Sequence, residues 1–306
     1  MSPGLRLQGG VFSVLALACA LAFVLAWVTV GLDGSSLAPM DELWLAAALI
    51  AVLGMPHGAL DAVFARKLLG VKGLLGWAAF SLAYVGLAAL VVALWALEPT
   101  LFLCGFLLVS ALHFGGDLPA RTVWVTRALY GGVIIVLPAL MHAHELQRLL
   151  GMVAGPASAA VVTPVLAQMA LPWLGATVVA GVLLALTSRL AALELTALAA
   201  VAVSAPPLLS FTVYFCAMHS PRHILRTLGS FPASELRQTL AMALWPTLAV
   251  FVVLTALVAT AALGWQSIGT SAQTWVMQVV FVGLAALTLP HVVLLERARR
   301  AGLPLP

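Results

Sequence analysis

The chain consists largely of apolar stretches that are each long enough to cross a lipid bilayer. A helix needs about 20 mostly apolar residues to span the hydrocarbon layer, and such stretches recur here between charged residues, Gly and Pro. Only 8% of the residues are charged, whereas an average soluble domain has about 25%. We therefore predict an all-α polytopic membrane protein of about ten (eight to ten) transmembrane helices. The predicted spans are 11–32, 43–65, 73–97, 100–118, 123–141, 166–188, 191–205, 207–226, 239–264 and 274–296.

Two adjacent prolines and the basic residues set the predicted orientation. Pro206 and Pro207 should end a helix, because proline lacks a backbone N–H and restricts the residue before it. Cytoplasmic loops carry an excess of Lys and Arg, and with a break at these prolines every basic residue except Arg148 falls on one side. We thus expect both termini in the cytoplasm and a single transmembrane domain over 1–306. The segment 142–165, with a short amphipathic stretch, is expected on the outer surface.

The net charge of +4 is explained by this orientation, so nucleic acid is not expected as a partner. The ionisable residues that lie inside the spans are more informative, because burying them in a membrane is costly. Two of the seven histidines, His142 and His144, lie at the outer end of a span beside Glu145 and are expected to be solvated. The other five lie within spans two, four, eight and ten: His57, His113, His219, His223 and His291.

These five histidines are predicted to lie at one depth in the membrane. Their spans run in the same direction, and His57, His113, His219 and His291 precede an arginine at the cytoplasmic end by nine, eight, seven and six residues. At a rise of about 1.5 Å per residue, their depths differ by only about 5 Å. His219 and His223 are four residues apart and so share one helical face. The pattern predicts an intramembrane metal site for one ion.

Imidazole ligands suit zinc, copper, iron or nickel and do not by themselves choose among them. Four histidines would close a tetrahedron around zinc, whereas six-coordinate iron would keep two open positions. Asp61 and Asp117 each follow a histidine by four residues, so we expect them on the same helical face, where they accept an imidazole N–H. Direct ligation by the two carboxylates is left open. Arg222, between two of the histidines, is expected at the membrane interface.

Four segments together are similar to those of the Brp/Blh family of bacterial and archaeal membrane β-carotene 15,15'-dioxygenases, which make retinal. The segments are PHGALD (56–61), HFGGD (113–117), YFCAMHSPRH (214–223) and LPH (289–291). The resemblance covers about 50–120 and 210–296. It implies a non-haem iron(II) centre whose four ligands are His57, His113, His219 and His223, with His291 a fifth, nearby histidine and an alternative ligand.

The same resemblance implies the reaction and its setting. The protein would be a multi-pass enzyme of the bacterial or archaeal inner membrane, which uses O2 to cleave β-carotene or a related carotenoid at the 15,15' double bond. The products would be two all-trans-retinal molecules, with a retinal-binding rhodopsin as a possible recipient. An apolar polyene dissolved in the lipid bilayer could enter sideways between helices. Aromatic residues near the level of the histidines are candidates for the wall of a substrate tunnel: Phe114, Phe211, Tyr214 and Phe215.

Two other functions are compatible with intramembrane His and Asp residues. A membrane zinc hydrolase could use three histidines, an aspartate such as Asp61 or Asp117 and a zinc-bound water on a lipid amide or ester. A proton-coupled transporter could carry ions along a polar path. The absence of internal repeats and the single depth of the histidines argue against the transporter.

Overall fold

The computed structural model describes residues 2–31, 39–119, 121–262 and 271–301, and every regular element in these ranges is a helix. A sharp turn at Gly155, whose φ is 86°, separates the amphipathic helix α8 (Ala143–Ala154) from the long helix α9 (Pro156–Thr187). The elements are α1 (Pro3–Val30), α2 (Pro39–Leu49), η1 (Ile50–Gly54), η2 (Met55–Leu60), α3 (Asp61–Leu68), α4 (Gly73–Leu97), α5 (Pro99–Phe114), η3 (Gly115–Asp117), α6 (Trp124–Val136), α7 (Pro138–Met141), α8 (Ala143–Ala154), α9 (Pro156–Thr187), α10 (Arg189–Ser204), α11 (Pro207–Tyr214), η4 (Phe215–His219), α12 (Ser220–Gly229), α13 (Ala233–Ala262) and α14 (Ala272–Arg300).

Eight helical segments within the described residues are long and apolar enough to cross a membrane. The all-helical membrane architecture is therefore confirmed, and eight of the ten predicted spans coincide with these segments. The remaining two predicted spans correspond to α10, which has only 16 residues, and to the consecutive elements α11, η4 and α12. As predicted, the chain breaks at Pro206 and Pro207, where α10 ends and α11 begins.

The predicted boundary of the sixth span was wrong. Helix α9 begins at Pro156 rather than at residue 166, because Gly155 adopts a left-handed φ and Pro156 is well suited to the first turn of a helix. The segment predicted to lie on the surface is therefore reduced to α8, whose leucines at 146, 149 and 150 are buried, and the turn after it. Residues 32, 263 and 264, at the ends of two predicted spans, lie outside the described residues.

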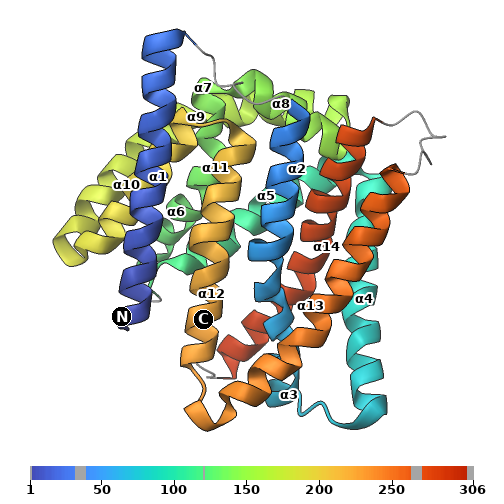
Figure 1. Ribbon diagram of the computed structural model, residues 1–306. Coiled ribbons are helices and arrows are strands. Elements are labelled where there is room, and N and C mark those ends of the chain that lie inside the picture. The colour runs from blue at the N-terminus through green and yellow to red at the C-terminus, as the bar shows by residue number, and fades with distance from the viewer. Residues whose placement is uncertain (1, 32–38, 120, 263–270, 302–306) are drawn as a thin grey trace.

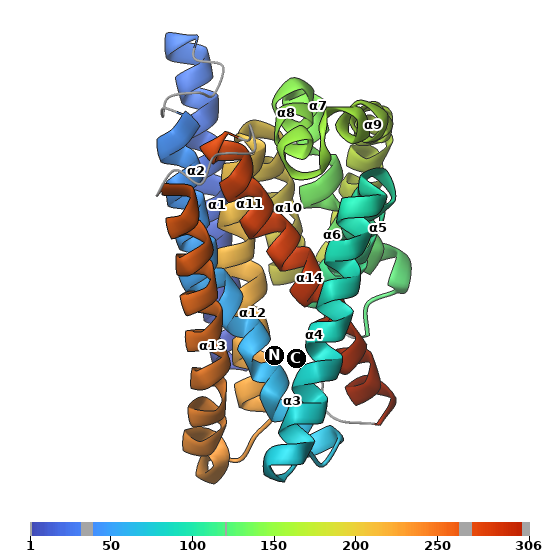
Figure 2. The same ribbon diagram turned by 90° about the vertical axis from the view of Figure 1, so that its right-hand side faces the viewer.

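The α2–α3 segment, the α11–α12 segment and α14, which together carry four of the five histidines, lie beside one another in the bundle (Figure 1). The α2–α3 segment, the α11–α12 segment and α14 run in the same direction between the two ends of the bundle. Helices α1 and α10 pack at one side, and α4 and α13 lie at the other (Figures 1 and 2). The start of α1 and the end of α14 lie toward the same end of the bundle.

Two π-helical turns, η1 and η4, interrupt the helices beside the histidines and contact each other. Such turns are rare and often occur at functional sites. At their contact, a Cβ on Gly54 would overlap the ring of Phe215, since it would lie 2.6 Å from Cδ1. The Ser220 hydroxyl donates to the Leu53 carbonyl at 2.7 Å and so joins the two segments. Glycine at position 54 therefore permits the close approach that brings His57 and His219 together.

Candidate metal centre

The structure brings all five predicted intramembrane histidines into one cluster. They come from five different elements: His57 from η2, His113 from α5, His219 from η4, His223 from α12 and His291 from α14. Ring centroids of neighbouring histidines are 4.7 to 5.5 Å apart, and each ring has at least two such neighbours. The common depth expected from the sequence thus becomes contact between rings from helices far apart in the chain.

The ring nitrogens within this cluster are suited to bind a cation. The Nε2 atoms of His113, His219, His223 and His291 are buried and have no hydrogen-bond partner among the described residues. Buried polar atoms are normally satisfied, because leaving them unpaired is costly. Three ring nitrogens, one each from His57, His113 and His291, lie within 4.8 Å of one another. Two imidazole nitrogens on opposite sides of a metal ion lie about 4 Å apart at ordinary bond lengths, so a small adjustment would allow shared coordination.

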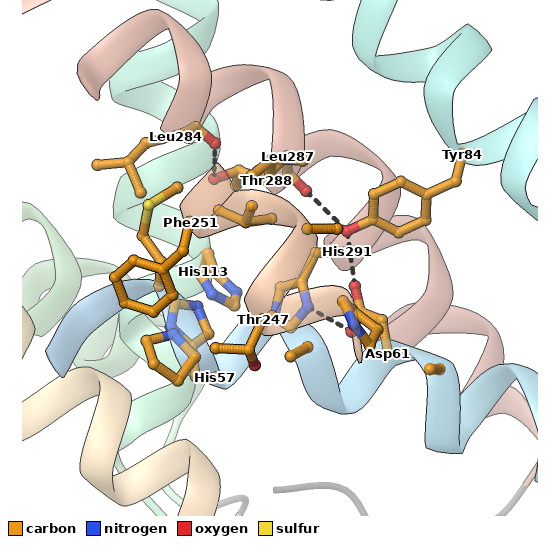
Figure 3. A pocket seen from close by; sticks show the side chains of 18 of the residues that line it. His57, Asp61, Tyr84, His113, Thr247, Phe251, Leu284, Leu287, Thr288 and His291 are labelled. Atoms are coloured by element: carbon orange, nitrogen blue, oxygen red, sulfur yellow. Dashed lines mark hydrogen bonds and ion pairs between the residues drawn. The ribbon is translucent and has the colours of Figure 1, made fainter. Parts of the chain in front are cut away.

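Two tyrosine–aspartate–histidine units fix the orientation of two of these rings. Asp117 accepts a hydrogen bond from Tyr214 at 2.6 Å and lies 3.2 Å from Nδ1 of His219. Asp61 accepts one from Tyr84 at 2.8 Å and lies 2.7 Å from Nδ1 of His291. Figure 3 shows this second unit, in which the Asp61 carboxylate lies between the phenol and the imidazole. Carboxylates in this position orient the histidines that ligate metals.

The aspartates pair with histidines of other segments, not with the histidines four residues before them. The expectation of a shared face assumed α-helical geometry, in which residues four apart are separated by about 40° around the axis. His57 lies in the 3-10 segment η2, and Asp117 in the 3-10 turn η3. With three residues per turn, residues four apart are separated by about 120°. His57 instead donates from Nδ1 to the Gly54 carbonyl at 2.5 Å.

Arg222 does not lie at the interface, and that expectation was wrong. Its side chain is 1% exposed and forms a two-pronged ion pair with Glu194, at 2.5 and 2.9 Å. Gln8 accepts a further hydrogen bond from Nε at 3.0 Å, and the Asp117 carbonyl accepts one from Nη1 at 3.2 Å. Because Glu194 lies in a predicted span 28 residues away, nothing in the local sequence indicated this pairing.

Arg226 also binds the turn that carries Asp117. It donates to the carbonyls of Gly116 and Asp117 at 2.7 and 2.6 Å. Two arginines therefore hold the backbone of η3, while Tyr214 holds the Asp117 carboxylate. The position of His219 thus depends on residues from α1, α10 and α12 as well as on its own helix.

The histidines open onto an apolar cavity of about 520 Å³. Four of them contribute to its lining, as do Phe114, Phe211 and Phe215. Tyr214 does not line the cavity; it is fully buried and donates to Asp117. The opposite wall comes from α4 and α13 and was not predicted, because ordinary apolar residues there carry no distinguishing signal. Its larger side chains are Trp77, Phe80, Tyr84, Trp245 and Phe251, of which Tyr84 and Phe251 are labelled in Figure 3.

The two histidines predicted to be solvated lie apart from the cluster. His142 precedes α8 and is half-buried, and His144, in the first turn of α8, is exposed. Burial lowers the pKa of the His142 imidazole below its usual value, partly offset by hydrogen bonds to the carbonyls of residues 203 and 204. Neither residue lines the cavity, and His142 is less solvated than predicted.

Sequence comparisons point to one family. The family model described as beta-carotene 15,15'-dioxygenase matches residues 48–297, a range that includes all five clustered histidines. The chain is 31% identical to the beta-carotene 15,15'-dioxygenase of an uncultured marine bacterium, 66A03, over 83% of this chain and 92% of that protein. It is 26% identical to the probable beta-carotene 15,15'-dioxygenase Blh of Halobacterium salinarum, over 68% of this chain and 70% of that protein. No solved structure matches the chain.

Proposed function

Because the chain belongs to the β-carotene 15,15'-dioxygenase family, we propose that it cleaves β-carotene, or a closely related carotenoid, at the central double bond. The reaction consumes one O2 and yields two all-trans-retinal molecules, so that each product carries one carbonyl oxygen. The observation that carries this proposal is the cluster of buried histidines at the wall of an apolar cavity. The family favours this reaction over lipid hydrolysis by zinc and over proton-coupled transport.

The proposed cofactor is one iron(II) ion, with His57, His113, His219 and His223 as ligands. Iron(II) would supply the activation of O2, for which the protein has no suitable group of its own. Neutral histidines do not offset the charge of a divalent ion, and an uncompensated charge in a membrane interior is costly. Asp61 and Asp117 are hydrogen-bonded to histidines of the cluster, Asp61 to His291 and Asp117 to His219. Their two negative charges would balance the ion without occupying its open positions.

The protein's own residues would bind the polyene and exclude water. Phe211 and Phe215 stack with ring centroids 5.3 Å apart, and Phe215 also stacks on His219 at 5.6 Å. This aromatic surface runs directly into the histidine cluster, so a flat conjugated chain lying on it would bring a double bond close to the metal ligands. The apolar lining would hold the polyene in a fixed position without hydrogen bonds.

The substrate would enter from the lipid between α4 and α13. Both helices contribute side chains to the cavity. In the most hydrophobic part of each helix, no residue is buried inside the protein. A carotenoid partitions into the hydrocarbon layer, so an entrance at this depth avoids passage through water. Retinal leaving by the same route would reach the bilayer, where a retinal-binding rhodopsin could collect it. We place the enzyme in the inner membrane with both termini in the cytoplasm.

The proposal is tested in cells that accumulate β-carotene. Cells that express the protein should lose β-carotene and gain retinal, and the purified protein should carry close to one iron per chain. His219→Ala should abolish both the retinal and the iron, with His142→Ala as the matched control that retains them. Iron without retinal would reject the substrate, and zinc with hydrolysis of a lipid would reject the oxidative reaction.

A further inference from the structure

We propose that His291 is itself a ligand of the metal ion, and that Asp61 and Tyr84 are the residues that position it. This inference rests on the metal centre proposed above and extends it, because the family resemblance assigns only four ligands. The relevant unit is Tyr84–Asp61–His291, shown in Figure 3, and its counterpart on the other side of the cluster is Tyr214–Asp117–His219.

The hydrogen bond to Asp61 fixes which nitrogen of His291 can bind a cation. An ionised carboxylate can only accept, so the contact of 2.7 Å between Asp61 Oδ1 and Nδ1 places the imidazole hydrogen on Nδ1. Nε2 is then left with a free lone pair. It is buried and has no partner among the described residues. His291 therefore presents an unsatisfied ligand atom, in the same arrangement as His219 with Asp117.

The position of His291 in the cluster is as central as that of the four assigned ligands. Its ring centroid lies 5.5 Å from that of His57, 5.1 Å from His113 and 5.0 Å from His223. Within the described residues, the ring nitrogens of His57, His113 and His291 also form the group close enough for shared metal coordination. A fifth histidine in that group is therefore better explained as a ligand than as a packing residue.

A role as an acid or base would be the alternative function for a histidine paired with aspartate. The balanced cleavage of a carotenoid by O2 transfers no net proton to or from the protein, because all hydrogens end on the two aldehydes. A proton-transfer residue is therefore not required by the overall reaction. The pairing of His291 with Asp61 matches the way proteins orient metal-ligating histidines.

Asp61 is in turn held from outside the histidine segments. Tyr84 lies on α4, and its hydroxyl is 2.8 Å from Asp61 Oδ2 and 3.4 Å from the Leu287 carbonyl of α14. The tyrosine thus fixes the carboxylate relative to α14, the helix that carries His291. Loss of its hydroxyl should loosen the imidazole without removing a ligand.

The test is metal binding by the full-length protein in detergent, with Co(II) as a spectroscopic substitute for iron. Affinity is measured by competition with a chelator, and coordination by the visible absorption bands of Co(II). His291→Ala should lower the affinity at least tenfold and change the Co(II) bands. Asp61→Asn should lower it 10- to 100-fold, the usual effect of removing a residue that orients a ligand. Tyr84→Phe should lower the affinity by a smaller factor.

Controls separate this inference from the proposed function and from misfolding. His142→Ala should leave the affinity and the bands unchanged, and added imidazole should restore the original bands to His291→Gly. If His291→Ala fails to fold, Asp61→Asn and Tyr84→Phe carry the test. Unchanged affinity and bands in the His291 and Asp61 variants would overturn the inference but leave the proposed function intact. A wild-type protein that binds no metal would overturn the proposed function itself.

Discussion

Replacing Glu194 with alanine should destabilise the protein strongly by leaving Arg222 charged, buried and without its carboxylate. Arg222 is 1% exposed and donates two hydrogen bonds to Glu194, at 2.5 and 2.9 Å. The remaining acceptors, Gln8 and the Asp117 carbonyl, are uncharged at 3.0 and 3.2 Å. Breaking one side of a buried ion pair costs about 3–5 kcal/mol.

The matched experiment removes both charges at once. Because Arg226 also donates to the Asp117 carbonyl, at 2.6 Å, the double variant Glu194→Leu/Arg222→Met leaves that carbonyl satisfied. Its stability should recover to within about 1–2 kcal/mol of the wild type, since well-packed apolar residues often replace a buried pair without loss. The free energy of unfolding is measured by titration with SDS in mixed micelles.

Two results would refute this reasoning. A loss below about 1 kcal/mol in Glu194→Ala would mean that the guanidinium finds water or another anion. A double variant as unstable as the single one would mean that the packing of these side chains, and not their charge, is what matters. Glu194→Gln, which keeps the shape and a hydrogen-bond acceptor, should fall between the wild type and Glu194→Ala.

Three further results are expected. Treatment with a strong Fe(II) chelator should abolish retinal formation, and Fe(II) should restore it whereas Zn(II) should not; recovery with zinc would contradict the oxidative reaction. Gly54→Ala should lower metal content and retinal formation, because its Cβ would overlap the Phe215 ring. The control Gly86→Ala, where a Cβ meets open space, should match the wild type in the same assays. Trp245→Ala should raise KM more than it lowers kcat in a micellar β-carotene assay, because this side chain lines the cavity at the α13 side; an effect confined to kcat would argue against entry there.

The sequence was sufficient to predict the membrane architecture and the convergence of the histidines. Charged residues near the ends of parallel spans indicate depth, and depth placed His57, His113, His219 and His291 at one level. His223 followed from its position one helical turn after His219. The break at Pro206 and Pro207 followed from the backbone chemistry of proline, which ends a helix. Depth gives no information about partners around the helix axis, and the partners expected for Asp61 and Asp117 depended on regular α-helical geometry.

The errors came where helices depart from that geometry or where partners are distant. Asp61 and Asp117 turned away from their neighbouring histidines because 3-10 turns rotate them. Arg222 was expected at the interface because its partner Glu194 is 28 residues away and on another helix. The cavity wall formed by α4 and α13 could not be predicted from the sequence, since its residues resemble those of any lipid-facing helix.

The two tyrosine–aspartate–histidine units differ in what holds their tyrosine. Tyr214 is enclosed in the protein core, whereas Tyr84 belongs to α4, which has no fully buried residue and is tied elsewhere by Trp95 donating to the Val153 carbonyl. Packing of the surrounding lipid chains against α4 would therefore help to hold this helix in place. The enzyme would be sensitive to its solvent. Short-chain detergents, which form thinner micelles, would loosen α4 from α14, weaken the hydrogen bond between Tyr84 and Asp61 and lower activity, and transfer into bilayers of matching thickness would restore it.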